Sequence, residues 1–287
     1  MTNEVAIVTD TIGCIPQEQV EKYGIELVPL NIVFGDKVYR DRIDINPSKF
    51  YALLRQAKKL PTTSAPSPSI FLEAYSKVSR QAANILCITL PAKLSGTFNS
   101  ARLAMERAKN AFPNVVIEVL DCGTAAAAHG LVVLAAARAA ASGKSLSEVV
   151  ETAERVMQQV NLLAMLDSLY YLVKVGRVPK AAPLISSLIK IKPIFTVTNG
   201  DAHPVTIVRT IPNGVKHILR TMRKKMEKGQ PFHVAVMHAD ALDRAIALRD
   251  QIASQFNCTE LFITEFTPVM GAHTGPGVIG VAFYSGD

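Results

Sequence analysis

The sequence predicts an α/β fold in two domains, with a parallel, doubly wound sheet over residues 1–157 and an α+β domain with a mixed or antiparallel sheet over residues 158–287. The first half alternates continuous apolar runs with helical segments, which is typical of buried parallel strands joined by crossover helices. The second half instead carries a hairpin signal and closely spaced strands. A chain of 287 residues is long enough for two such domains.

The first half contains three apolar runs that we expect to be the strands of the parallel sheet: VAIVTD (5–10), NILCITL (84–90) and VVIEVLD (115–121). Residues 25–41 are expected to be extended, with a turn at Gly35 and Asp36. The Pro- and Ser-rich segment 61–68 is predicted to be a loop.

Helices of the first half are expected at residues 47–60, from Ser69 onward, after Gly96, at 124–141 and from Ser145 to 160. Ser145 and Glu148 form the S-x-x-E pattern of a capping box, which supports the start of the last of these helices. Helices therefore separate every pair of predicted parallel strands.

The second half is expected to contain a hairpin over residues 192–210, which turns at Asn199-Gly200-Asp201. Its other strands are predicted at 162–167, 231–239, 260–267 and 277–285. Its helical segments are predicted at 168–176, 183–191, 212–228 and 241–256.

The composition is apolar for a protein that we expect to be soluble and cytoplasmic. Hydrophobic residues make up 49% of the chain and the mean hydropathy is +0.21, yet no apolar run is long enough for a membrane span and the N-terminus lacks a signal-peptide pattern. The apolar excess therefore predicts a large core, or a core that encloses something apolar. The four cysteines have no zinc or disulfide spacing and are expected to be free thiols.

The net charge of +7 comes from dispersed basic residues with one cluster: Arg220, Arg223, Lys224, Lys225 and Lys228. This cluster is either a solvated helix face or a contact for an anionic membrane surface or an acidic partner. With no Trp and no aromatic residues interleaved, nucleic acid is not an expected partner.

Two short motifs resemble nucleotide-binding signatures but lack the required context. SGKS (142–145) follows a helix and has Arg138 where a P-loop needs its first Gly, so it is interpreted as a helix end followed by a new cap. GPGVIG (275–280) precedes a strand rather than a helix. It is interpreted as a tight loop in which glycines let a ligand or another backbone come close.

The corner LSGTF (94–98) has three interpretations. Ser95, Gly96 and Thr97 lie where a predicted strand passes into a predicted helix, at the sheet edge that also carries Asp10. Ser95 could cap the helix, act as a nucleophile, or help bind an anion at the helix N-terminus. No G-x-S-x-G pattern is present, because Lys93 occupies the position of the first Gly, and no base adjoins Ser95 in the sequence, although His129 and His273 are candidates. The anion site is the favoured interpretation. No metal-binding pattern is found.

Six segments taken together resemble the DegV family of bacterial fatty-acid-binding proteins. In chain order they are IVTDTIGCIP (7–16), PTTSAPSP (61–68), LSGTFNSA (94–101), SLYYLVKVGRV (168–178), SLIKIKPIFTV (187–197) and GAHTGPGVIGVAFY (271–284). The resemblance implies an N-terminal Rossmann-like domain and a C-terminal α/β domain, with one long-chain fatty acid buried between them. It implies no cofactor or metal and no catalytic role of its own.

The same resemblance implies a role as the lipid-carrying subunit of a fatty acid kinase. The protein would present the fatty acid carboxylate to a separate ATP-dependent kinase, which makes an acyl phosphate for phospholipid synthesis. Two alternatives stay open: a lipid hydrolase or acyltransferase with Ser95 as the nucleophile, and a lipid-sensing regulatory protein.

Site residues follow from the matching motifs. The resemblance places Thr63 and Ser95 as hydrogen-bond donors to the carboxylate and His273 beside them, with Thr62, Gly96 and Thr274 as flanking members of the site. Arg177, in VGRV, matches an exposed arginine associated with kinase docking. Hydroxyl, imidazole and backbone N–H groups suit this ligand because a carboxylate only accepts hydrogen bonds.

This chain departs from the family pattern at three positions near these motifs. Ala65 stands where the family usually has Gln, Phe98 where it has Tyr, and Val175 where it has Gly. Ala65 and Phe98 remove polar groups next to the expected carboxylate site, and Val175 changes the segment that carries Arg177. The preferred chain length, the oligomeric state and the identity of the kinase do not follow from the sequence.

Overall fold

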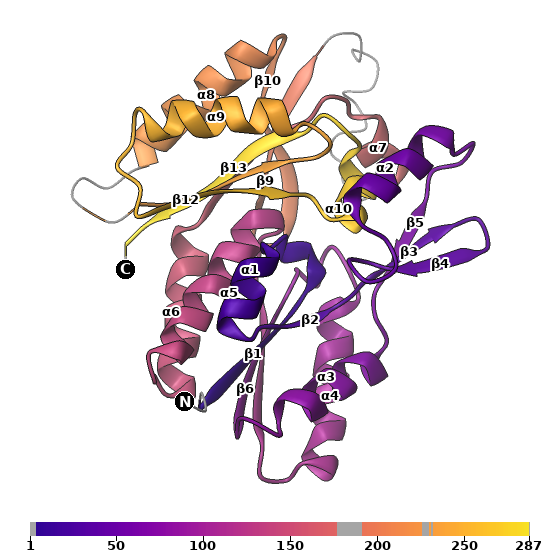
Figure 1. Cartoon of the computed structure of the whole chain (residues 1–287), viewed down its shortest axis with the longest axis vertical. Coiled ribbons are helices and arrows are strands. Elements are labelled where there is room, and N and C mark those ends of the chain that lie inside the picture. The colour runs from indigo at the N-terminus through magenta and orange to yellow at the C-terminus, as the bar shows by residue number, and fades with distance from the viewer. Residues whose placement is uncertain (1–3, 177–190, 226–229, 231, 287) are drawn as a thin grey trace.

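The computed structural model describes residues 4–176, 191–225, 230 and 232–286, and these form an α/β fold with two main sheets. Figure 1 shows the parallel sheet of the first half below and the mixed sheet of the second half above. One main sheet is parallel and the other is mixed, so the predicted fold class is confirmed. The division into domains at residue 157 stays a prediction; helix α6 (Leu146–Gln159) runs through that residue.

The parallel sheet has the strand order β2-β1-β6-β7. Its strands are β1 (Val5–Asp10), β2 (Glu26–Val28), β6 (Asn84–Thr89) and β7 (Val116–Asp121). The chain leaves β1 toward β2 on one side and later adds β6 on the other side. Connections after β1 and β6 therefore diverge, and such a switch point leaves a crevice beyond the carboxyl ends of the two strands.

Helices cover both faces of this sheet. On one face, α3 (Pro68–Val78) and α4 (Thr97–Ala111) pack through Phe71, Tyr75 and Ala104. The other face is covered by α5 (Ala126–Ala141) and α6, whose capping box between Ser145 and Glu148 is present as predicted. A shorter helix, α1 (Gln17–Tyr23), packs against α5.

The second sheet has six strands in the order β10-β9-β8-β13-β11-β12. They are β8 (Asn161–Met165), β9 (Lys192–Thr198), β10 (Asp201–Val208), β11 (Phe232–His238), β12 (Glu260–Glu265) and β13 (Ile279–Ser285). Only the β11–β12 pair is parallel. Helices α8 (Ile211–Lys225) and α9 (Leu242–Ala253) cover its outer face, while its inner face packs on α5. One apolar core thus runs from the parallel sheet through α5 into the mixed sheet.

A small third sheet corrects the predicted loop at 61–68. Strand β3 (Asn31–Phe34) pairs with β4 (Lys37–Arg40) across the expected Gly35-Asp36 turn, and on its other edge with β5 (Thr62–Ser64). The three residues of β5 are all polar and carry no apolar alternation. They become a strand because β3 offers an unpaired edge, which is a tertiary effect. Helix α2 (Pro47–Gln56) lies between β4 and β5 in the chain.

One short helix was not expected from the sequence pattern, and a second lies within a segment that was predicted to be helical. The predicted strand 260–267 ends at Glu265, and α10 (Pro268–Thr274) follows it with a proline in its first turn. The segment predicted as helical at 168–176 contains α7 (Tyr170–Lys174). The predicted helix at 183–191 falls almost wholly outside the described residues, as does the end of the helix predicted at 212–228.

The glycine loop 275–277 contains two residues with positive φ, 72° at Gly275 and 88° at Gly277. A Cβ atom on Gly275 would lie 2.1 Å from the ring of Tyr171. The glycines therefore allow α7 to approach this loop, as the interpretation of a tight loop with close approach predicted.

The four cysteines are free, as expected, and burial raises the pKa values of Cys14 and Cys87 to about 12. Within the described part of the chain, none of the helices combines the length and the hydropathy needed to cross a membrane.

Asp41 predicts a measurable pH dependence of stability. Its carboxylate is buried and accepts a hydrogen bond from Thr11 Oγ1 at 2.6 Å. Burial raises the pKa of Asp41 to about 6 from 3.8. Because the folded chain holds this proton more tightly than the unfolded chain, the free energy of unfolding should fall as the pH rises from about 4 to about 6, by roughly 3 kcal/mol from this group.

Urea unfolding across this pH range is the measurement. Asp41→Asn removes the titration while keeping an acceptor for Thr11, so its stability should change less with pH than that of the unaltered chain. Parallel pH profiles for the two proteins would contradict this assignment.

Candidate functional site

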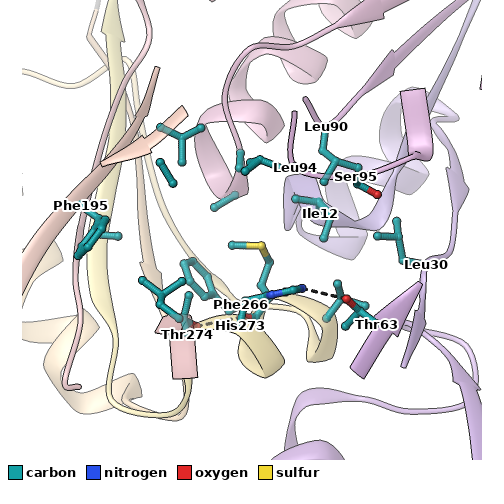
Figure 2. A pocket seen from close by; sticks show the side chains of 18 of the residues that line it. Ile12, Leu30, Thr63, Leu90, Leu94, Ser95, Phe195, Phe266, His273 and Thr274 are labelled. Carbon is teal, nitrogen blue, oxygen red and sulfur yellow. Dashed lines mark hydrogen bonds between the residues drawn. The ribbon is translucent and has the colours of Figure 1, made fainter. Parts of the chain in front are cut away.

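An apolar cavity of about 240 Å³ lies where the crevice of the parallel sheet meets the mixed sheet. Its walls come from both halves of the chain, and Figure 2 shows the side chains that point into it. Most are apolar, including Ile12, Leu30, Leu90, Leu94, Phe195 and Phe266. An apolar cavity of roughly 150 Å³ is already large enough to hold benzene. This cavity is therefore suited to a longer hydrocarbon group.

The strand ends of the parallel sheet form one wall. Ile12 follows β1 in a short 3-10 helix, η1 (Thr11–Gly13), and Leu90 follows β6. Asp10 joins the two segments, because one carboxylate oxygen accepts from Ile12 N at 3.0 Å and the other from Leu90 N at 2.7 Å. Burial raises the pKa of Asp10. The Asp10 carboxylate thus holds the segments that carry Ile12 and Leu90 next to each other in this wall of the cavity.

The hairpin β9–β10 closes the far side. Val197 and Ala202 line the cavity, and the turn between the strands reaches back to the first half. Gly200 N donates to the carbonyl of Gly123 at 2.8 Å, and the Lys93 ammonium lies 3.0 Å from the Asp201 carboxylate. These contacts hold the hairpin against the loop that carries Ser95.

Polar groups gather on one side of the cavity. Figure 2 shows Thr63 and Ser95 on the side opposite Phe195. Thr63 Oγ1 and His273 Nε2 are hydrogen bonded at 3.0 Å, which joins β5 to α10. The two residues are separated by 210 positions in the chain. The structure therefore brings together Thr63, Ser95 and His273, the three principal residues that the motifs predicted, in the lining of one cavity.

Ser95 lies just before the first turn of α4, whose N-cap residue is Gly96. Its hydroxyl is 2.9 Å from Thr97 Oγ1 and accepts from Thr97 N at 3.3 Å. Ser95 is thus not the N-cap itself, which corrects that interpretation of the corner. Ser95 and Gly96 both line the cavity, so the N-terminal end of α4 faces it. A helix N-terminus carries partial positive charge and favours an anion.

Of the flanking residues of the predicted site, some line the cavity and others do not. Thr274 lines the cavity, but its hydroxyl already donates to the Met270 carbonyl at 3.0 Å. Gly96 has open space, since an added Cβ would meet only Ala65 Cβ at 3.8 Å. Thr62 is exposed and does not line the cavity, although its neighbours in β5 do. Arg177 lies outside the described residues.

The three departures from the family pattern have simple structural consequences. Ala65 lines the cavity and presents a methyl group to it. Phe98 lies outside the lining, with its ring 5.9 Å from the Arg102 guanidinium carbon. Val175 ends α7 with φ at −85°, so this position does not require a glycine.

The geometry does not favour Ser95 as a nucleophile. In the described part of the structure the hydrogen-bond partners of Ser95 Oγ both belong to Thr97, and neither candidate base is among them. His129 is buried and hydrogen bonded to Thr9 at 3.0 Å, and burial lowers its pKa. Among the described residues, no three or more His, Cys, Asp or Glu side chains form a group that could hold a metal ion.

Sequence reasoning missed the apolar walls. Phe195, Phe266 and Met270 come from β9, from the segment after β12 and from α10. Each is an ordinary apolar residue of its own element, and no motif distinguishes it from a core residue. The apolar excess of the whole chain indicated only a large core or a core that encloses something apolar.

Comparison with known proteins decides the family. A family model described as an uncharacterised protein of the DegV family matches residues 4–286. This chain belongs to the DegV family. A DegV domain-containing protein of Streptomyces coelicolor is 34% identical over 99% of this chain and 100% of its own length.

Solved DegV structures share the whole fold. A DegV family protein of Thermus thermophilus, described as binding fatty acid, has a TM-score of 0.91 with 29% identity, covering 98% of this chain and 99% of its own. DegV of Bacillus subtilis, described as a fatty acid binding protein, has a TM-score of 0.89 with 28% identity and the same coverage. The resemblance that the motifs carried is therefore confirmed at the level of the family and the fold.

Proposed function

We propose that this DegV chain binds one long-chain fatty acid, with the carboxylate between Thr63 and Ser95 and the acyl chain directed toward Phe195. The observation that carries this proposal is the cavity itself, which is apolar along its length and has hydroxyl groups and a helix N-terminus on one side. The fatty acid binding described for the Thermus thermophilus and Bacillus subtilis relatives supports it.

The polar side matches a carboxylate in hydrogen-bonding capacity. A carboxylate accepts hydrogen bonds and donates none, so it needs donors. When His273 Nε2 carries its proton and donates to Thr63 Oγ1, the threonine hydroxyl proton is directed to the ligand. Ser95 Oγ and the N–H groups at the start of α4 supply further donors.

The apolar walls account for the affinity. Each buried CH2 group contributes roughly 0.8 kcal/mol, so a chain of about 15 methylenes gains roughly 12 kcal/mol before the costs of association are subtracted. Binding within walls held by the β9–β10 hairpin requires a gap to open during loading.

We further propose that the bound carboxylate is presented to a separate ATP-dependent fatty acid kinase, and that this chain is a non-catalytic carrier subunit. In that reaction a carboxylate oxygen forms a bond to the γ-phosphorus of ATP, while the bond from this phosphorus to the β,γ-bridging oxygen breaks and ADP leaves. No Lys, Arg, Asp or Glu lines the described cavity. Neutral donors leave more nucleophilic character on the carboxylate than a buried ion pair would.

The acyl phosphate would then enter phospholipid synthesis. This role places the chain in the cytoplasm, with the ligand between the proposed domains 1–157 and 158–287. The exposed basic side chains of α8, among them Arg220, Arg223 and Lys224, offer a surface for brief contact with an anionic membrane.

Native mass spectrometry after purification from a bacterial host tests the binding proposal. The expected result is a mass excess equal to one long-chain fatty acid, which organic extraction identifies. A chain that carries no fatty acid and takes up none when it is added would contradict the proposal. Hydrolysis of a lipid ester without ATP would favour the hydrolase alternative, and binding without acyl-phosphate formation by any fatty acid kinase would favour the sensor alternative.

Ala164 predicts how acyl-chain length is selected. It lines the cavity and pairs with Phe195 across β8 and β9, away from the polar side. Ala164→Phe would fill part of this end, so the bound fatty acids should shift to shorter chains by several carbons. Gas chromatography of the extracted lipids measures the shift. An unchanged chain-length profile would mean that the acyl chain ends elsewhere.

A further inference from the structure

A second hollow adjoins the apolar cavity at Thr63 and His273. It is an open recess of about 460 Å³, and Thr63 and His273 line both it and the apolar cavity. Its remaining walls come from the segment after α2, from β5, from the end of α7 and from α10. The two hollows therefore share the wall at which the proposed carboxylate lies.

The recess is basic. Lys58, Lys59 and Lys174 line it, and its lining contains no Asp or Glu. None of the three ammonium groups forms an ion pair within the described part of the chain. By contrast, Lys77, Lys93, Lys109 and Lys192 each pair with a carboxylate. Three lysines that have no carboxylate partner among the described residues thus line one recess beside the site.

The two hollows differ in what they can solvate. The apolar cavity is lined by hydrocarbon and by neutral donors but, among the described residues, by no Lys or Arg, and burying a doubly charged group without a cationic partner is costly. The recess is open to water and offers three cations. Lysine binds phosphate as a flexible point charge and needs no fixed geometry, which fits exposed side chains.

We propose that the recess lined by Lys58, Lys59 and Lys174 is a binding site for the phosphoryl group of an acyl phosphate whose carbonyl lies at Thr63. This inference rests on the proposed function and adds a subsite to it. The acyl chain stays in the apolar cavity, the carbonyl lies at the shared wall, and the phosphoryl group extends into the recess. The recess would strengthen binding of the acyl phosphate, which is the product of phosphoryl transfer. It would have little effect on the affinity for the fatty acid itself.

The test compares two ligands that share an acyl chain. Hexadecanoate ends at the carboxylate. In 2-oxoheptadecylphosphonate a CH2 group replaces the bridging oxygen of hexadecanoyl phosphate, so the ligand keeps the carbonyl and the phosphoryl charge without hydrolysing. The variant is Lys58→Gln/Lys59→Gln/Lys174→Gln in the full chain. Lys37→Gln/Lys144→Gln/Lys216→Gln removes the same charge from exposed positions outside the recess and serves as the matched control.

The recess variant should bind the phosphonate about tenfold more weakly while its affinity for hexadecanoate changes by less than about twofold. The control variant should bind both ligands like the unaltered chain. Raising the ionic strength should weaken phosphonate binding to the unaltered chain more than to the recess variant, because fewer charges remain to be screened.

If the recess variant and the control variant bind the phosphonate with equal affinity, the inference is overturned. It is also overturned if the recess variant loses affinity for the phosphonate and for hexadecanoate by the same factor. The unaltered chain failing to bind hexadecanoate would overturn the proposed function together with this inference. Binding of hexadecanoate with no lysine-dependent preference for the phosphonate would overturn this inference alone.

Discussion

Replacing Thr63 and Ser95 together by alanine is expected to abolish the retention of a long-chain fatty acid during purification. Both residues line the cavity on the side opposite Phe195. A hydrogen bond to an ionised group is worth about 1.5–3 kcal/mol, so losing two weakens binding by roughly 100-fold or more. Titration with a fluorescent fatty acid measures the affinity, and native mass spectrometry measures the retained ligand.

The control for this experiment is Thr221→Ala/Ser254→Ala. These residues have the same types, and their hydroxyls donate to the carbonyls of His217 and Gln251, away from the cavity. The control should retain its fatty acid. A Thr63→Ala/Ser95→Ala protein that is folded and still carries a full equivalent of fatty acid would show that the carboxylate lies elsewhere.

Gly130→Ala is expected to destabilise the chain by at least about 2 kcal/mol, although alanine is the better helix former by roughly 1 kcal/mol. Gly130 lies in α5, which is buried on nearly its whole surface. A Cβ at this position would lie 2.3 Å from the carbonyl oxygen of Gly13 in η1. The added Cβ atom and the Gly13 carbonyl oxygen are both fixed to the backbone. Relieving the overlap therefore requires α5 or η1 to shift, which costs stability. Urea unfolding measures the loss.

Gly214→Ala provides the comparison. Its Cβ would come 2.1 Å from Met165 Sδ, which is the flexible end of a side chain rather than backbone. The expected loss of stability is therefore smaller than for Gly130→Ala. If the two variants lose the same stability, the η1 backbone shifts to accommodate the new methyl group as easily as the Met165 side chain does. Since Ile12 in η1 lines the cavity, Gly130→Ala should also weaken fatty acid binding.

Most of the fold could be predicted because the hydrophobic pattern is local. The apolar runs at 5–10, 84–90 and 115–121 became β1, β6 and β7 within a residue of their expected ends. The pattern failed at β5, whose three polar residues carry no period and pair only because β3 presents an edge. It also failed at α10, which is too short to display a helical period.

The candidate site divides in the same way. Thr63, Ser95 and His273 were found through short motifs, and all three line the cavity. Thr62 was included because it adjoins Thr63, but it is exposed and does not line the cavity. The lysines of the recess were not singled out at all, since isolated basic residues on three different segments form no motif.

By itself the sequence determined the fold class, the order of most elements and the large apolar core. These properties depend on residue type and on spacing within single segments, whereas the residues of the polar side were named through the resemblance to the DegV family. Only the tertiary structure decided that the Thr63–His273 hydrogen bond joins residues 210 positions apart, and that these two residues line both an apolar cavity and a basic recess. Such contacts depend on how distant segments pack, which no local pattern encodes.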